Sequence, residues 1–209
     1  MKYLLEAYLS YFVHPIQSSL AAAYPLDQSQ IKLNLQDSIL ISWIFQIFRG
    51  LIQIIFFYFI FETLKIATGD FIIDGLISTF LATEKITSAF FFIIPTVLEL
   101  LFFPIVSYFY CEFWIYIMKH SFRIAALTER REELAEQIVV RANTSHIFSV
   151  VPIVGEIFQK FAFIFYLYVG LRKSAYLSRF ESIIIVLSPI FIVLFVIFLL
   201  LNLLMIFKW

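Results

Sequence analysis

Long apolar segments alternate with short polar and charged stretches along the 209-residue chain. Five segments are predicted to cross a lipid bilayer as helices, at about 39–61, 90–118, 138–151, 157–171 and 182–207. A helical crossing needs about 20 mostly apolar residues. Four of the five segments are mostly apolar, whereas the third is half polar. The pattern predicts an all-α, polytopic membrane protein with five transmembrane helices.

The composition agrees with a lipid environment. Apolar residues make up 62% of the chain and charged residues 14%, whereas a soluble domain has about 45–50% and about 25%. The mean hydropathy is +0.95. A chain of 209 residues cannot hide that much apolar surface in a water-soluble core. The net charge is zero, so no general attraction to nucleic acid is expected.

The N-terminal stretch, residues 3–13, is predicted to form an aromatic-rich amphipathic helix at the membrane surface. A disordered tail is the alternative. A signal peptide is disfavoured, because Glu6 interrupts the apolar run and Pro15 ends it before a cleavage site. The chain is therefore divided into an N-terminal interfacial segment, residues 1–38, and a five-span membrane domain, residues 39–209.

One face of the first predicted span is polar. Its members recur at steps of three or four residues, which places them on one side of a helix: Asn34, Ser38, Ser42, Gln46, Arg49 and Gln53. Such a face is expected to meet protein or water, because it cannot face lipid. Packing between helices is the favoured interpretation, and the wall of a polar cavity is the alternative.

Two charged residues lie near the middle of predicted spans. Arg49 is in the first span and Glu99 is in the second, and an ionised side chain at mid-bilayer costs about 2.5–3.5 kcal/mol. Their similar depth suggests that they form a buried pair. The second span, about 43 Å long as a helix, is expected to tilt or to kink at Pro95 or Pro104.

The third predicted span is polar enough to require shielding by its neighbours. A charged helix that begins at Thr128 is expected to lead into it. Together with the first span it supplies the candidate polar face, interpreted as packing or as a cavity wall: Gln46, Gln53, Arg141, Asn143 and His146.

No pattern of the sequence points to catalysis or to a cofactor. Within the predicted spans there is no His-x-x-x-His, no cysteine pair and no dense acidic cluster, so no metal site is expected. There is no Gly-x-Ser-x-Gly motif and no glycine-rich phosphate loop. His146 is interpreted as a hydrogen-bonded packing residue.

The loops predict an orientation. On the N-terminal side lie Lys2, Lys32, Lys119, Arg123, Arg130, Arg131, Arg172, Lys173 and Arg179, against Lys65, Lys85 and Lys208 on the other side. The positive-inside rule then places the N-terminus in the cytoplasm and the C-terminus on the opposite side. The basic group at 119–131 is interpreted as a topology-setting loop. Contact with anionic lipid or with a soluble partner is the alternative for Lys119, Arg123, Arg130 and Arg131.

The order of segments resembles the Yip family, polytopic proteins named for interaction with Ypt/Rab GTPases, and in particular its bacterial relatives. The resemblance covers about residues 30–205 and rests on a polar third span that ends in Pro152-x-x-Gly155, an aromatic fourth span that ends in Gly170-Leu171-Arg172, and a serine-containing turn before the last span. It implies five spans, a cytoplasmic N-terminus and no known catalytic residues.

Three functions are weighed. The favoured one is a non-enzymatic scaffold, or a subunit of a larger homo- or hetero-oligomeric assembly, in the inner membrane of a bacterium. A small transporter or channel component is the alternative, using the polar faces of the first and third spans. A membrane-embedded enzyme is the third. The expected partners are the lipid bilayer, anionic lipid at its cytoplasmic face, and another protein chain.

Overall fold

The computed structural model describes residues 2–17, 33–68, 88–124, 131–152 and 154–206. All elements in these ranges are helical, in the order α1 (Lys2–Val13), α3 (Leu35–Thr68), α5 (Ser88–Ile124), α6 (Arg131–Asn143), η1 (Thr144–Val150), α7 (Val154–Lys173) and α8 (Arg179–Ile206). The all-α prediction is therefore confirmed for the described part of the chain.

In the described part of the chain, four helices are long and apolar enough to cross a membrane, and they make this an integral membrane protein. The qualifying stretches are Leu35–Ile60, Ile93–Arg123, Val154–Lys173 and Arg179–Asn202. They match four of the five predicted spans. The first helix continues to Thr68, through residues expected to begin a loop at Glu62. At 34 residues it is about 51 Å long, so it exceeds the roughly 30 Å hydrocarbon core.

The segment predicted as the third span forms α6 and then η1, which follows α6 directly. Together they lie at the centre of the bundle. Residues 138–145 are buried throughout, and α6 packs against α3, α5 and α7. This central position is the shielding that its polar residues require. The segment is not among the four helices that qualify by composition. The predicted start at Thr128 lies outside the described residues, but Glu132 and Glu133 do occupy the first turn of α6.

The change from α-helix to 3₁₀-helix at Thr144 has a local cause. The Thr144 hydroxyl donates to the carbonyl of Arg141 at 2.7 Å, and the Ser149 hydroxyl donates to the carbonyl of His146 at 2.6 Å. Such side-chain bonds compete with the α-helical ladder. Seven residues is long for a 3₁₀ run, and such stretches often mark a functional or strained part of a helix.

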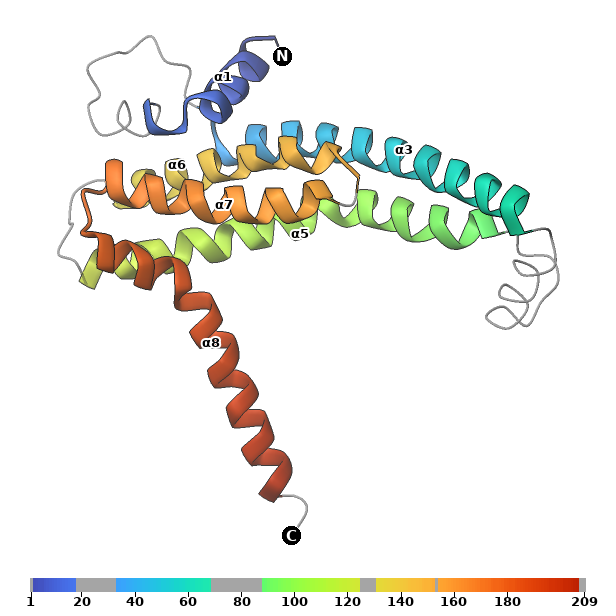
Figure 1. Cartoon of the computed structure of the whole chain (residues 1–209). Helices are drawn as coiled ribbons and strands as arrows, with labels where there is room; N and C mark the ends of the chain where they lie inside the picture. The colour runs from blue at the N-terminus through green and yellow to red at the C-terminus, as the bar shows by residue number, and fades with distance from the viewer. Residues whose placement is uncertain (1, 18–32, 69–87, 125–130, 153, 207–209) are drawn as a thin grey trace.

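A tight turn reverses the chain between η1 and α7, so that the two helices form a hairpin. The amide of Gly155 donates to the carbonyl of Val151 at 3.0 Å, and the amide of Val154 donates to Pro152 at 2.7 Å. Farther along, Gly170 lets α7 approach α6 closely, because a Cβ there would lie 2.7 Å from Cγ2 of Ile138. Figure 1 shows α6 and α7 side by side, with α3 and α5 extending past the tip of this hairpin.

The N-terminal helix packs on the bundle rather than lying apart from it. Tyr8 is fully buried and Tyr11 nearly so, and both belong to the same hydrophobic cluster as the central helices. The hydroxyl of Tyr166 on α7 also donates to the carbonyl of Phe12 at 3.1 Å. The helix α1 of the N-terminal segment therefore contributes to the core of the bundle.

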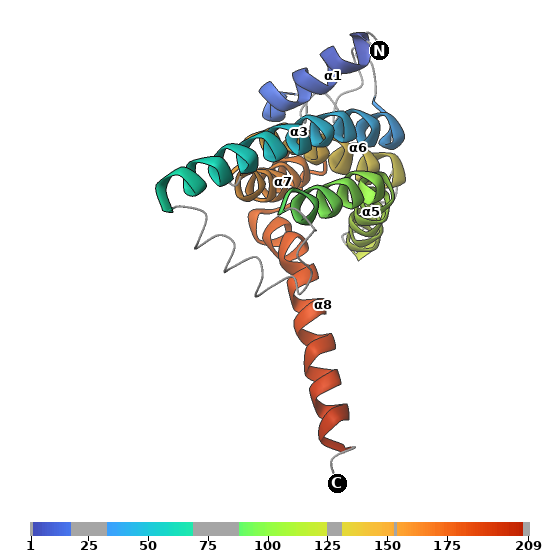
Figure 2. The ribbon, with the colours of Figure 1, turned by 90° about the vertical axis from the view of Figure 1, so that its right-hand side faces the viewer.

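The last helix leaves the bundle. A reciprocal cap begins it: the Ser178 amide donates to the Glu181 carboxylate at 2.7 Å, and the Glu181 amide donates to the Ser178 hydroxyl at 3.2 Å. Residues 191–202 are exposed on every side (Figures 1 and 2). A helix that is apolar all round needs lipid or protein around it.

Candidate functional site

Two polar clusters lie inside the bundle. The first is centred on Asn143, at the junction of α6 and η1. Its side-chain amide donates to the hydroxyls of Ser38 at 3.0 Å and Ser42 at 2.9 Å, both on α3. The Tyr8 hydroxyl is 2.8 Å from that of Ser42 and donates to the backbone carbonyl of Asn143 at 3.0 Å. Cys111 contributes a weak contact at 4.0 Å.

This first cluster is closed to solvent. Asn143 is 1% exposed, and Tyr8, Ser38 and Ser42 are fully buried. Burial raises the pKa of Tyr8, because the phenolate would lose its hydration, so the hydroxyl stays protonated. The cluster thus joins α1, α3 and α6 through satisfied hydrogen bonds, which is a structural role.

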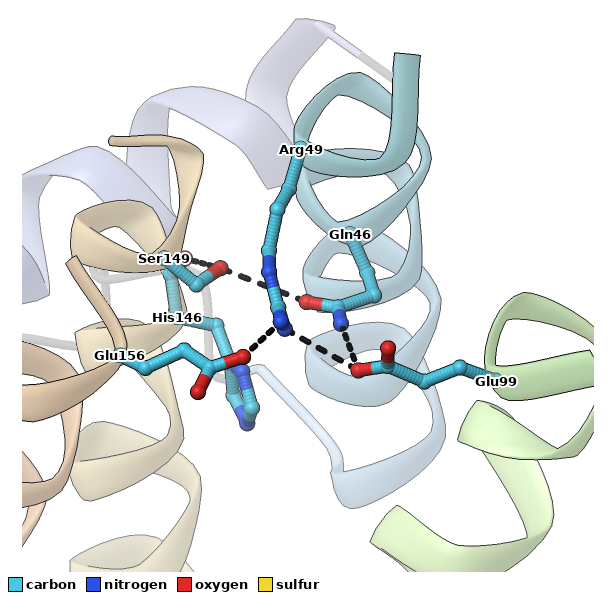
Figure 3. A network of polar contacts seen from close by, with 6 residues as sticks. All are labelled: Gln46, Arg49, Glu99, His146, Ser149 and Glu156. Carbon is cyan, nitrogen blue, oxygen red and sulfur yellow. Dashed lines mark hydrogen bonds and ion pairs between the residues drawn. The ribbon is translucent and has the colours of Figure 1, made fainter. Parts of the chain in front are cut away.

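The second cluster is charged and lies at the tip of the α6–α7 hairpin (Figure 3). Arg49 on α3 is at its centre. One guanidinium nitrogen is 3.1 Å from Glu99 on α5, and another contacts the carboxylate of Glu156 on α7. Gln46 donates to the same oxygen of Glu99 at 2.8 Å and accepts a bond from Ser149 at 3.4 Å.

The charged side chains of this second cluster differ in solvent exposure. The Arg49 side chain is 11% exposed, whereas the carboxylate side chains of Glu99 and Glu156 are 48% and 44% exposed. His146 faces the cluster from η1, within electrostatic reach of Arg49. Its ring packs edge-on against Phe103 with centroids 5.2 Å apart, and its buried Nδ1 atom has no hydrogen-bond partner in the described structure.

The structure brings together Arg49 and Glu99, the two residues expected to form a buried pair, but Glu99 is half-exposed, so the pair is not fully buried. The structure also adds a second acid, Glu156. An acid and a base four residues apart on one helix usually form a pair, so Lys160 would be the ordinary partner of Glu156. Glu156 binds Arg49 instead. Nothing in the sequence marks this partner, because the contact depends on how the hairpin tip meets α3.

The five residues of the candidate polar face are divided between sites. Gln46 and His146 belong to the charged cluster and Asn143 to the buried one. Gln53 lies beyond Arg49, half-buried and without a hydrogen bond in the described region. Arg141 is separate: it is 6% exposed, lies 5.3 Å from the ring centroid of Tyr11, and donates to Ser174 at 3.4 Å.

The four basic residues expected to meet lipid or a partner are only partly placed. Lys119 forms an ion pair with Glu132 at 3.4 Å, which ties the end of α5 to the start of α6. Arg123 is exposed in the last turn of α5. Arg131 begins α6, and Arg130 lies outside the described residues.

Within the described ranges, no group of three or more His, Cys, Asp or Glu side chains is arranged to hold a metal ion. Comparison with family models, with curated proteins and with solved structures finds no match to this chain. Its resemblance to the Yip family therefore stays a prediction.

The charged cluster gives a stability prediction. Arg49→Ala leaves two carboxylates without their cation, and breaking a fully buried pair costs about 3–5 kcal/mol. Because both acids are half-exposed, we expect a loss of about 2 kcal/mol in the free energy of unfolding. Adding Glu99→Ala should recover part of that loss, which a double-mutant cycle in mild detergent will measure. A double variant as unstable as the sum of the single variants would rule out coupling.

Proposed function

We propose that this protein is a non-enzymatic, Yip-like scaffold or assembly subunit, with five crossings of the inner membrane of a bacterium. The main support for the proposal is that the polar side chains on the first and third predicted spans are buried and hydrogen-bonded. Asn143, Ser42 and Gln46 are each at most 3% exposed, and their polar groups bind one another or Glu99. They act as contacts between helices, whereas a transport path needs polar groups that face water.

The fifth crossing is supported by the length and burial of the central segment. Thirteen α-helical and seven 3₁₀ residues together rise about 34 Å, enough for a hydrocarbon core of about 30 Å. Because neighbouring helices cover it, this segment can be polar and still cross. Five crossings with the distribution of Lys and Arg given above favour a cytoplasmic N-terminus and a C-terminus on the opposite side.

The exposed helices favour a partner. The outer part of α8 is apolar on every side, and exposed apolar side chains also follow α3 from Leu51 to Ile60. In a bilayer such surfaces face lipid or pack against other membrane helices. We propose that they are the contact surfaces of a homo- or hetero-oligomer.

One observation favours the alternative, a transporter or channel component. Glu99 is half-exposed inside the second predicted span, and Glu156 is half-exposed just before the fourth. Intramembrane acids that reach the surface of a bundle often face a water-filled path. A transporter or channel component requires water at the charged cluster, whereas a scaffold does not.

Labelling of introduced cysteines can distinguish a scaffold from a transporter component. The chain has one native cysteine, Cys111, which is buried and can be replaced. In a Cys111→Ala background, we expect Ser42→Cys and Gln46→Cys to resist a water-soluble thiol reagent in intact membranes. The matched control is Arg123→Cys, at the exposed end of α5, which should react from the cytoplasmic side alone. Purification in mild detergent should then give a complex of fixed stoichiometry. Rapid labelling of Gln46→Cys together with a monomeric mass would overturn the scaffold.

A further inference from the structure

The charged cluster holds two carboxylates for one guanidinium. Arg49 contributes one positive charge, and Glu99 and Glu156 contribute two negative charges when both are ionised. His146 faces them from η1 and adds no charge when its imidazole is neutral. Phe12 of α1 packs on Phe148 of η1. Lys160 on α7 is exposed and forms no ion pair with another described residue. The cluster therefore carries one negative charge in excess.

That excess charge lies within segments that qualify as membrane spans. Arg49 falls inside Leu35–Ile60 and Glu99 inside Ile93–Arg123, and Glu156 lies in the first turn of Val154–Lys173, at one end of that stretch. A net charge in the hydrocarbon region is unfavourable. When two carboxylates share one site, the usual response is that one of them keeps its proton.

The hydrogen bonds indicate which acid keeps it. One oxygen of Glu99 accepts hydrogen bonds from both Gln46 and Arg49. Among the described residues, Glu156 has Arg49 alone as a polar partner. Its place in the first turn of α7 favours the anion too, but a helix dipole contributes less than a hydrogen bond to a charged group. A proton on His146 would place a second positive charge beside Arg49, so a carboxyl group is the better acceptor.

We propose that Glu156 is a proton-binding site of the membrane domain, and that its proton neutralises the cluster formed with Arg49 and Glu99. His146 is compatible with this assignment. Its Nδ1 atom is buried and has no hydrogen-bond partner in the described structure. A protonated Glu156 would bring an O–H donor to the same cluster. The inference holds whether the protein is a scaffold or a transporter component.

Infrared spectroscopy of the whole protein in lipid nanodiscs tests the proposal at neutral pH. The wild-type spectrum should contain the C=O stretch of one protonated carboxyl per chain, shifted in D₂O. Glu156→Gln should lose that band. Glu99→Gln should lose it as well, because with one acid removed Arg49 balances Glu156 and the proton is released. Glu132→Gln, at the exposed start of α6, is the matched control and should keep the band.

The two glutamine variants make the result decisive. A band that survives in Glu156→Gln would place the proton elsewhere and overturn the assignment. A band that survives in Glu99→Gln would overturn the charge-balance argument. If Glu156→Gln does not fold, the spectrum of Glu99→Gln decides the proposal by itself. A wild-type spectrum that lacks any such band also overturns the proposal.

Thermal unfolding gives a second readout with a defined sign. A glutamate in an unfolded chain releases its proton at about pH 4.3. If the folded protein keeps a proton on Glu156 at neutral pH, it binds more protons than the unfolded chain, so its stability must fall as the pH rises. The melting temperature of the wild type should decrease from mildly acidic to mildly alkaline pH. The decrease should be smaller in Glu156→Gln, and an equal slope in both proteins would contradict the proposal.

Discussion

Gly155→Ala is expected to abolish the folded state or to destabilise it severely. Gly155 is buried at the start of α7, and a Cβ there would overlap the carbonyl oxygen of Phe148 and lie 3.2 Å from its carbonyl carbon. These are backbone atoms of η1, which cannot rotate aside as a side chain can. Moving them would break the bond from the Val151 amide to that carbonyl. We expect a loss of about 3 kcal/mol or more, the upper end for overpacking.

Gly50→Ala is the matched control. A Cβ at Gly50 would meet Cδ1 of Leu100 at 3.0 Å and Cγ2 of Thr96 at 3.2 Å. Both are ends of side chains that can adjust, and replacing a helical glycine by alanine gains about 0.5–1 kcal/mol. Thermal melts of both variants in detergent, followed by size-exclusion chromatography, will compare them. If Gly155→Ala melts as Gly50→Ala does, the hairpin tip is less tightly packed than the structure indicates.

The positions of the membrane helices could be predicted because lipid imposes a simple rule. A crossing segment must be apolar over about 20 residues, and four such segments are visible in the sequence. The end of the first helix could not be predicted in the same way. Hydropathy falls at Glu62, yet the helix continues to Thr68, because a helix that leaves the hydrocarbon can stay helical in water.

The charged cluster could be predicted only in part, for a related reason. Two isolated charges at similar depth suggest a pair, and Arg49 and Glu99 do lie in contact. Glu156 follows a turn, where an acid is commonplace, and its contact depends on the three-dimensional meeting of α3 with the hairpin tip. Tyr8 is a similar case, because an amphipathic aromatic helix looks alike whether its apolar face meets lipid or protein.

Asn143→Leu is expected to cause the largest loss among substitutions of the buried polar cluster. Leucine is similar in size but cannot donate to Ser38 and Ser42, whose hydroxyl oxygens then lose a donor in a site closed to solvent. A hydrogen bond between membrane helices is worth about 0.6 kcal/mol on average and about 1.7 kcal/mol at most. Two such bonds, together with the lost donor at each hydroxyl oxygen, give an expected loss of about 2–3 kcal/mol.

The matched control for this substitution is Asn202→Leu on α8. Asn202 is exposed, and its amide donates only to the carbonyl of Phe198 in its own helix at 2.7 Å. In lipid, leucine at that position should leave the stability unchanged or raise it. A double-mutant cycle between Asn143→Leu and Ser42→Ala should show coupling, because each removes a partner of the other. Additive losses would mean that the cluster does not act as a unit.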